Sequence, residues 1–264
     1  MATTDGSIAK TNKAVLPKLL EIGVEAVNIL PVSSSAFVID AFALLQMLPK
    51  VPERFVDLSK LVFTTVVRQA GDAKRIYFVA DQYPETSIKD LKHRKREDIG
   101  KFAVQITSPQ QFCPRQWKKF MSEGANKNNL MKFLVHDWSS NRSFTDKLDD
   151  RQLFVTRGES CTKISVHDGK ISAVPIPELN SNHEEADTRM LLHVQHSSKA
   201  GYERVFVKSS DTDVEVIACY HQATIRSEIY IISGTKTRSR TLRISRICEN
   251  LGLKSAKLFQ VFMP

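Results

Sequence analysis

The sequence predicts an α/β fold, a three-layer sandwich in which helices flank a mainly parallel central sheet. The first observation is a set of four short runs rich in Val, Ile, Phe and Tyr: Ser35–Asp40, Arg75–Asp81, Arg204–Lys208 and Glu228–Ser233. These runs are mostly apolar and do not alternate cleanly, which is typical of strands covered on both faces. The second observation is that helical patterns lie between the runs. This order favours parallel strands joined by right-handed crossovers.

Helical candidates occupy the intervals between the strands. In chain order they are Ala41–Leu48, Val51–Gln69, Arg115–Glu123, Asn128–Trp138, Glu184–Ser198 and Val214–His221. The last two come immediately before and after the third strand, as a repeated strand–helix pattern requires.

The middle of the chain, from about Asp98 to Leu179, is less regular. It contains short β-like pieces at Leu153–Thr156 and around Lys163–Val166, and "VPIPELNSN" at its end is expected to be a loop because of its Pro, Asn and Ser residues. We therefore divide the chain into a partly helical or flexible lead-in over residues 1–34 and a single domain over residues 35–264. That domain has an insertion at about residues 98–179.

The composition is that of a soluble globular protein, with 42% hydrophobic and 25% charged residues. No apolar stretch approaches the roughly 18 residues of a membrane span, and the N-terminal "MATTDGSIAKTNK" lacks a hydrophobic signal core. The sequence therefore predicts neither a membrane contact nor secretion. Its four cysteines are widely separated, which favours the reduced thiols of an intracellular protein over a disulfide framework or a zinc site.

The charge balance is basic, with 38 Lys and Arg against 29 Asp and Glu, and this makes a polyanion such as nucleic acid a candidate partner. The densest basic run is "KDLKHRKR" over Lys89–Arg96. It is interpreted either as a phosphate-binding surface or as a solvated basic face or nuclear-import patch. A second, more widely spaced basic stretch around "RSRTLR" is typical of a solvated strand or loop.

Three of the four predicted strands end in an acid, Asp40, Asp81 or Asp211, and Asp213 lies two residues further on. The carboxyl ends of parallel strands meet at one edge of a sheet, where ligands bind. Carboxylates crowded there are unfavourable unless protonation or a cation offsets their charge, and Mg²⁺ is the natural cation for oxygen ligands. The alternative is that each Asp is a turn former or a helix N-cap, and Asp211 could cap the helix that begins near Val214.

Two further acids, Glu185 and Asp187, precede an apolar helical stretch in "HEEADTRMLLHVQH". Side chains two residues apart on a regular helix point about 200° apart. The two can share a site only if Glu185 lies in the lead-in or the first turn of the helix. Acids are also favoured at a helix N-terminus without any ligand, so this alternative stays open.

These segments together resemble the flap endonuclease (XPG-type) branch of the PIN-like nucleases. "FVID" followed by "AFALLQML" resembles the first acidic motif of that family, and "IYFVADQYPETSIKDLKHRKRE" resembles the segment in which a strand-ending Asp precedes a basic helix. "EEADTRMLLH" and "SSDTDVEVIA" resemble its "EAEA" and "DxD" motifs. The four motifs keep the family order over roughly residues 35–235.

The resemblance implies phosphodiester hydrolysis with two Mg²⁺ or Mn²⁺ ions. The implied catalytic and metal-binding residues are Asp40, Asp81, Glu185, Asp187, Asp211 and Asp213. The implied phosphate-contacting residues are Lys89, Arg94 and Lys95. A non-catalytic descendant that binds nucleic acid or protein is the alternative. We also expect the protein to be intracellular, and in the nucleus rather than in the cytoplasm.

The sequence also resembles mobile-element-associated animal proteins that share the "EEADTRM…SSDTDV" signature. In those relatives the segment after "LG" leads to a "HAFTGCD" motif with one more acid, whereas here "ICENLGLKSAKLFQVFMP" ends at Pro264. We therefore expect an incomplete C-terminus and a weaker hold on the second metal ion.

Overall fold

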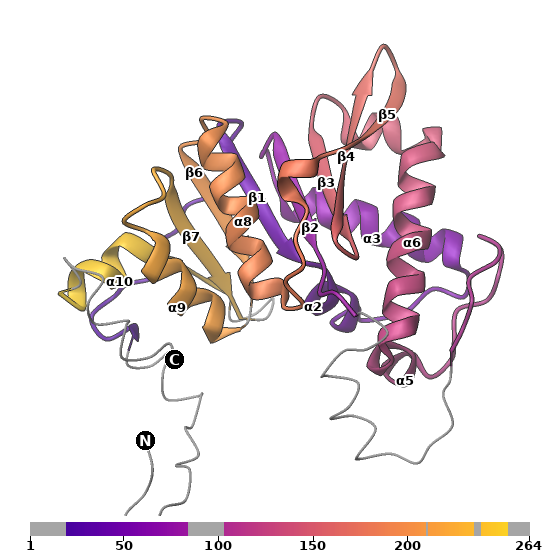
Figure 1. Cartoon of the computed structure of the whole chain (residues 1–264), viewed down its shortest axis with the longest axis horizontal. Coiled ribbons are helices and arrows are strands. Elements are labelled where there is room, and N and C mark those ends of the chain that lie inside the picture. The colour runs from indigo at the N-terminus through magenta and orange to yellow at the C-terminus, as the bar shows by residue number, and fades with distance from the viewer. Residues whose placement is uncertain (1–19, 84–102, 210, 235–238, 253–264) are drawn as a thin grey trace, which may run out of the picture.

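The predicted α/β class is confirmed by the computed structural model, which describes residues 20–83, 103–209, 211–234 and 239–252. Helices lie on both faces of an eight-stranded sheet with the strand order β5-β4-β3-β2-β1-β6-β7-β8 (Figure 1). The arrangement is compatible with a three-layer sandwich. Within these residues, none of the helices combines the length and the apolar character needed to cross a membrane.

The sheet has a parallel centre and antiparallel edges. The strands are β1 Ser35–Asp40, β2 Arg75–Val79, β3 Gln152–Arg157, β4 Ser160–His167, β5 Lys170–Pro175, β6 Arg204–Lys208, β7 Glu228–Ser233 and β8 Arg240–Arg243. Strands β3, β2, β1, β6 and β7 run parallel, and β4, β5 and β8 pair antiparallel. The chain builds outward from β1 through β2 and β3 on one side, and through β6 and β7 on the other. The strand order therefore reverses between β1 and β6.

The helices divide between the two faces. They are α2 Ala41–Gln46, α3 Phe55–Gln69, α5 Trp117–Ser122, α6 Gly124–Ser140, α7 Thr145–Leu148, α8 Ala186–Lys199, α9 Thr212–His221 and α10 Ile244–Asn250, with 3₁₀ turns at Arg142–Phe144 and Pro177–Leu179. Residues of α2, α3, α5, α6 and α7 belong to one core cluster. Residues of α8, α9 and α10 belong to the other.

Strand β1 shows why the apolar runs lack alternation. Successive side chains of a strand point to opposite faces. Phe37 and Ile39 therefore pack in the cluster that includes α3 and α6, while Ala36 and Val38 pack in the cluster that includes α8 and α9. All four are buried, so apolar residues are required at every position of the strand.

The predicted bounds of β1, β6 and β7 are confirmed, and the second strand is shorter than predicted. It ends at Val79, so Asp81 lies beyond the strand and not within it. The reason is that the backbone N–H of Ala80 donates to the Thr156 side chain, at 2.7 Å, and the next described contact, from Gln82 N to the Glu184 carbonyl, at 2.9 Å, is with the approach to α8.

The middle segment contributes directly to the sheet. The β-like pieces predicted there extend into β3 and β4, and β3 pairs in parallel with β2. The loop predicted for "VPIPELNSN" is partly wrong, because Val174 and Pro175 end strand β5 and a 3₁₀ turn follows at Pro177–Leu179. Strand β5 lies at the sheet edge with mostly exposed side chains, which is why it has no apolar signature.

A buried polar network holds α6 against α3. The Trp138 indole Nε1 donates to the Ser59 hydroxyl at 2.9 Å, and this hydroxyl donates to the carboxylate of Asp137. Asn141 donates to the other oxygen of the same carboxylate at 3.1 Å. Ser59 and Trp138 are fully buried, so the hydroxyl is the partner of two groups that are withdrawn from water.

We predict that Ser59→Ala lowers the free energy of unfolding by about 1–3 kcal/mol, because it leaves the indole N–H and one carboxylate oxygen without a partner. Urea unfolding measures the change. The matched control is Ser140→Ala, since Ser140 is exposed and donates only to a carbonyl of its own helix; it should stay within about 0.5 kcal/mol of wild type. Equal effects of the two substitutions would contradict the network.

Candidate metal centre

Acidic residues from four segments meet at the carboxyl edge of the parallel strands. Asp40 is the last residue of β1, Asp81 follows β2, Asp187 lies in the first turn of α8, and Asp211 and Asp213 begin α9. The site is next to the β1–β6 reversal. This position is where open α/β sheets form their ligand-binding crevice.

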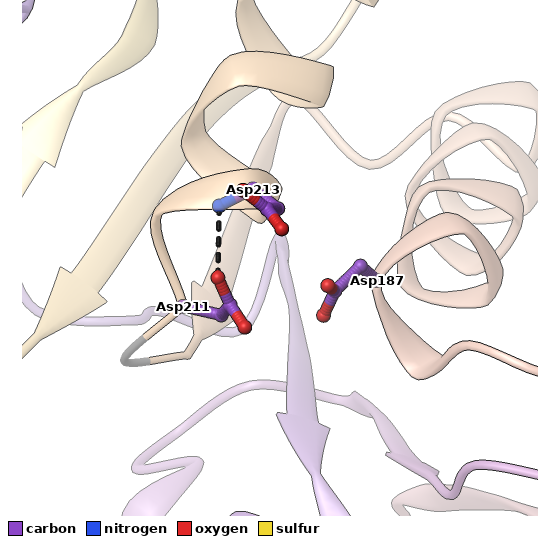
Figure 2. A group of neighbouring side chains, drawn as sticks. All are labelled: Asp187, Asp211 and Asp213. Atoms are coloured by element: carbon purple, nitrogen blue, oxygen red, sulfur yellow. Dashed lines mark hydrogen bonds between the residues drawn. The ribbon is translucent and has the colours of Figure 1, made fainter. Parts of the chain in front are cut away.

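Three of these acids form a group that could hold a metal ion. Asp187, Asp211 and Asp213 each offer a carboxylate oxygen, and the three oxygens lie within 4.8 Å of one another. Figure 2 shows that the side chain of Asp187, on α8, points toward the two acids at the start of α9. We call these three residues the acidic triad.

Asp211 is both a helix cap and a member of the triad. Its Oδ1 accepts a hydrogen bond from the Asp213 backbone N–H at 3.0 Å (Figure 2), and its own N–H donates to the Ser209 hydroxyl at 3.1 Å. The capping alternative raised by the sequence is therefore confirmed. It does not compete with metal binding, because a carboxylate has two oxygens and several acceptor sites.

Asp40 is also a cap and lies beside the triad. Its Oδ1 accepts from the Ala43 backbone N–H at 2.9 Å, at the start of α2. Burial and the charges of Asp81 and Asp211, opposed by backbone hydrogen bonds, together raise the pKa of Asp40 to about 6. The charge of Asp40 therefore interacts with acids from two other segments of the chain.

Asp81 is held by protein donors from two directions. Its Oδ2 accepts from the Tyr83 hydroxyl at 2.8 Å, and its Oδ1 accepts from the backbone N–H of Ala186, the first residue of α8, at 2.7 Å. Lys127 of α6 donates in turn to the Tyr83 hydroxyl at 2.7 Å. Asp81 therefore ties the end of β2 to the start of α8 and fixes the position of Asp187, one residue further on.

Among the acids at this site, Asp187 has the largest rise in pKa. Burial and, after it, the charges of Asp211, Asp40, Asp81 and Asp213 together raise its pKa to about 7. A shift of this size beside four other acids means that the ionised form is disfavoured in the folded protein. A bound cation would reverse this effect.

Glu185 takes the position that the sequence required, but it lies outside the triad. It is the N-cap residue of α8, not part of the regular helix, and its side chain makes no capping hydrogen bond. The pKa of the Tyr83 hydroxyl is raised mainly by burial, and the charges of Asp81 and Glu185 add to this rise. Glu185 therefore lies near the Asp81–Tyr83 pair. Of the six predicted acids, the structure groups three as the triad, places Asp40 and Asp81 beside them, and does not include Glu185 in the group.

The remaining predicted site residues, Lys89, Arg94 and Lys95, lie outside the described residues. Two residues near the site were not predicted. Tyr83 orients Asp81, and Arg189 of α8 is fully buried and donates through Nη1 to the Ala80 carbonyl at 2.9 Å. Arg189 could have been found from the helical period, because it shares a buried face with Ala186, Met190 and His193.

No family model, curated protein or solved structure matches the chain. The assignment of the site therefore depends on its geometry.

We predict that Asp187→Asn stabilises the protein at pH 8 in the absence of divalent cations. The raised pKa of Asp187 means that the folded state binds more protons than the unfolded state between about pH 4 and pH 7, so stability is lost as pH rises through this window. Asn at this position cannot ionise, so the variant does not lose this stability as the pH rises. After discounting for solvent screening of a half-buried group, the gain is about 1–2 kcal/mol.

Thermal unfolding in chelator at pH 8 and pH 4.5 measures the effect. The gain should shrink at pH 4.5, where Asp187 is protonated in the folded protein. The control is Asp168→Asn, an exposed acid in the β4–β5 turn, which should show no pH-dependent difference from wild type. A variant that is no more stable than wild type at pH 8 would contradict the crowding of these acids.

Proposed function

We propose that this domain is a PIN-like, flap endonuclease-related nuclease that hydrolyses phosphodiester bonds of DNA or RNA with the help of divalent metal ions. The single observation that carries the proposal is the convergence of Asp187, Asp211 and Asp213 from two helices at the strand-order reversal. The order of the acidic motifs in the sequence supports it.

The donor set fits Mg²⁺ or Mn²⁺. All three triad ligands are carboxylates, and hard divalent cations prefer oxygen donors. Asp187, Asp211 and Asp213 would hold the ion, with Asp40 next to it. When bound, such an ion polarises the phosphoryl group, lowers the pKa of water and stabilises the charge of an in-line displacement.

The protein's own residues supply a group of carboxylates whose positions are fixed by hydrogen bonds. Asp211 and Asp40 are oriented by the helix starts that they cap, and Asp81 orients the start of α8. Protonation of Asp187 and Asp40, whose pKa values are about 7 and about 6, competes with cation binding. Activity is therefore expected to fall as the pH is lowered through this range.

Nucleic acid is the partner that the charge balance favours, given the excess of Lys and Arg. Lys89, Arg94 and Lys95 follow Asp81 in the chain and are proposed to contact the phosphates beside the scissile bond. The same basic run supports the proposal of a nuclear location.

The second candidate is a PIN-like module with impaired catalysis that binds nucleic acid or protein. The observation that favours it is that both oxygens of Asp81 accept hydrogen bonds from protein donors. An Asp81 used in this way is a positioning residue, so fewer carboxylates are left to hold a second metal ion.

The test is a cleavage assay with single-stranded, flap and duplex substrates in Mn²⁺. We predict that Asp211→Asn combined with Asp213→Asn reduces the cleavage rate at least about 100-fold, because it removes two charges that stabilise the metal site. Asn is itself a good N-cap, so the start of α9 is preserved. Asp168→Asn serves as the control and should cleave like wild type.

Cleavage that survives in the double variant would contradict the proposal. Binding of the same substrates by a wild-type protein that cleaves none of them would favour the second candidate.

A further inference from the structure

A cleft with a volume of about 480 Å³ opens beside the acidic cluster, which is the triad together with Asp40 and Asp81. It lies between α2, α3 and the carboxyl ends of β1, β6 and β7, and its walls are largely apolar. Ile39, Leu44, Leu48, Leu61 and Ile232 line it, and Met47, which is 51% exposed, stands among them. This volume and lining are those of a pocket for a small ligand.

The cleft and the acidic cluster share one residue. Asp40 lines the cleft, and its pKa is raised in part by the charges of Asp81 and Asp211. A ligand in the cleft would therefore adjoin any group held at the cluster. Asp40 thus belongs both to the apolar cleft and to the group of interacting acids.

The polar groups of the cleft suit a nucleotide. Arg68 and Lys208 line it and supply positive charge. Gln69 also lines it, and its side-chain oxygen Oε1 is buried without a hydrogen-bond partner among the described residues. A buried acceptor without a partner calls for a donor, and a ligand N–H can provide one.

We propose that this cleft binds the nucleobase of the nucleotide next to the phosphate held at the acidic cluster; the inference rests on the proposed function. The apolar walls contact the faces of the base, and Arg68 and Lys208 attract the phosphate that is attached to it. The acceptor on Gln69 favours bases with an exocyclic amino group. Adenine and cytosine have this donor on the edge where thymine has a carbonyl oxygen.

The experiment measures binding of dAMP, dCMP and dTMP to the full chain by calorimetric titration in Ca²⁺. We expect dAMP and dCMP to bind at least about 10-fold more tightly than dTMP, as expected when a site built to hydrogen-bond an amino group meets a base without it. Gln69→Leu removes the acceptor and should bring the three affinities close together.

Met47→Trp places a larger side chain in the exposed wall of the cleft and narrows it, so it should weaken the binding of all three nucleotides. Its matched control is Leu30→Trp, because Leu30 is an exposed leucine that does not line the cleft. Thermal unfolding of each variant checks that the fold is kept. Equal affinity for the three nucleotides, or binding that Met47→Trp leaves unchanged, overturns the proposal, as does the absence of binding.

The outcome can be separated from that of the proposed function. Cleavage that depends on Asp211 and Asp213 but is insensitive to the Met47 and Gln69 variants rejects the base pocket and keeps the nuclease. Nucleotide binding that responds to these variants in a protein without cleavage keeps the pocket and rejects the nuclease.

Discussion

The structure depends on one electrostatic constraint: the parallel strands bring their carboxyl ends to one edge, and this sequence places an acid after three of them. Because β1 lies between β2 and β6, Asp40 comes between Asp81 on one side and Asp211 on the other. The strands cannot move apart to relieve the repulsion, since their side chains are buried on both faces. Burial, together with the charges of the neighbouring acids, raises the pKa values of Asp40 and Asp187.

The backbone offsets part of this repulsion. Asp40 and Asp211 accept hydrogen bonds from the first turns of α2 and α9, and Asp81 accepts one from the first residue of α8. The N-terminus of a helix carries partial positive charge, so each of these contacts favours the ionised carboxylate. Capping and ligand binding are therefore not alternatives for Asp40 and Asp211, each of which uses only Oδ1 in its cap. The same hydrogen bonds that form the helix starts also aim the acids.

The sequence was sufficient to predict features that depend on local pattern. Strands such as Ser35–Asp40 were predictable because burial on both faces leaves a continuous apolar run. Strand β5 was not, because an exposed edge strand imposes no such pattern. The place of Asp40 and Asp211 at the sheet edge could be inferred from parallel topology. The contact between Asp81 and Ala186 joins residues far apart in the chain, and no local pattern encodes it.

The central claim is that the triad binds a divalent cation, and Mn²⁺ binding measured by electron paramagnetic resonance tests it most directly. Free Mn²⁺ gives a strong signal that is lost on binding, so a titration at pH 8 gives the affinity without requiring catalysis. We predict saturable binding to the wild type that Asp187→Asn and Asp213→Asn each weaken at least about 10-fold, while Asp168→Asn leaves it unchanged. Binding that is absent from the wild type, or unchanged in the triad variants, would contradict the account.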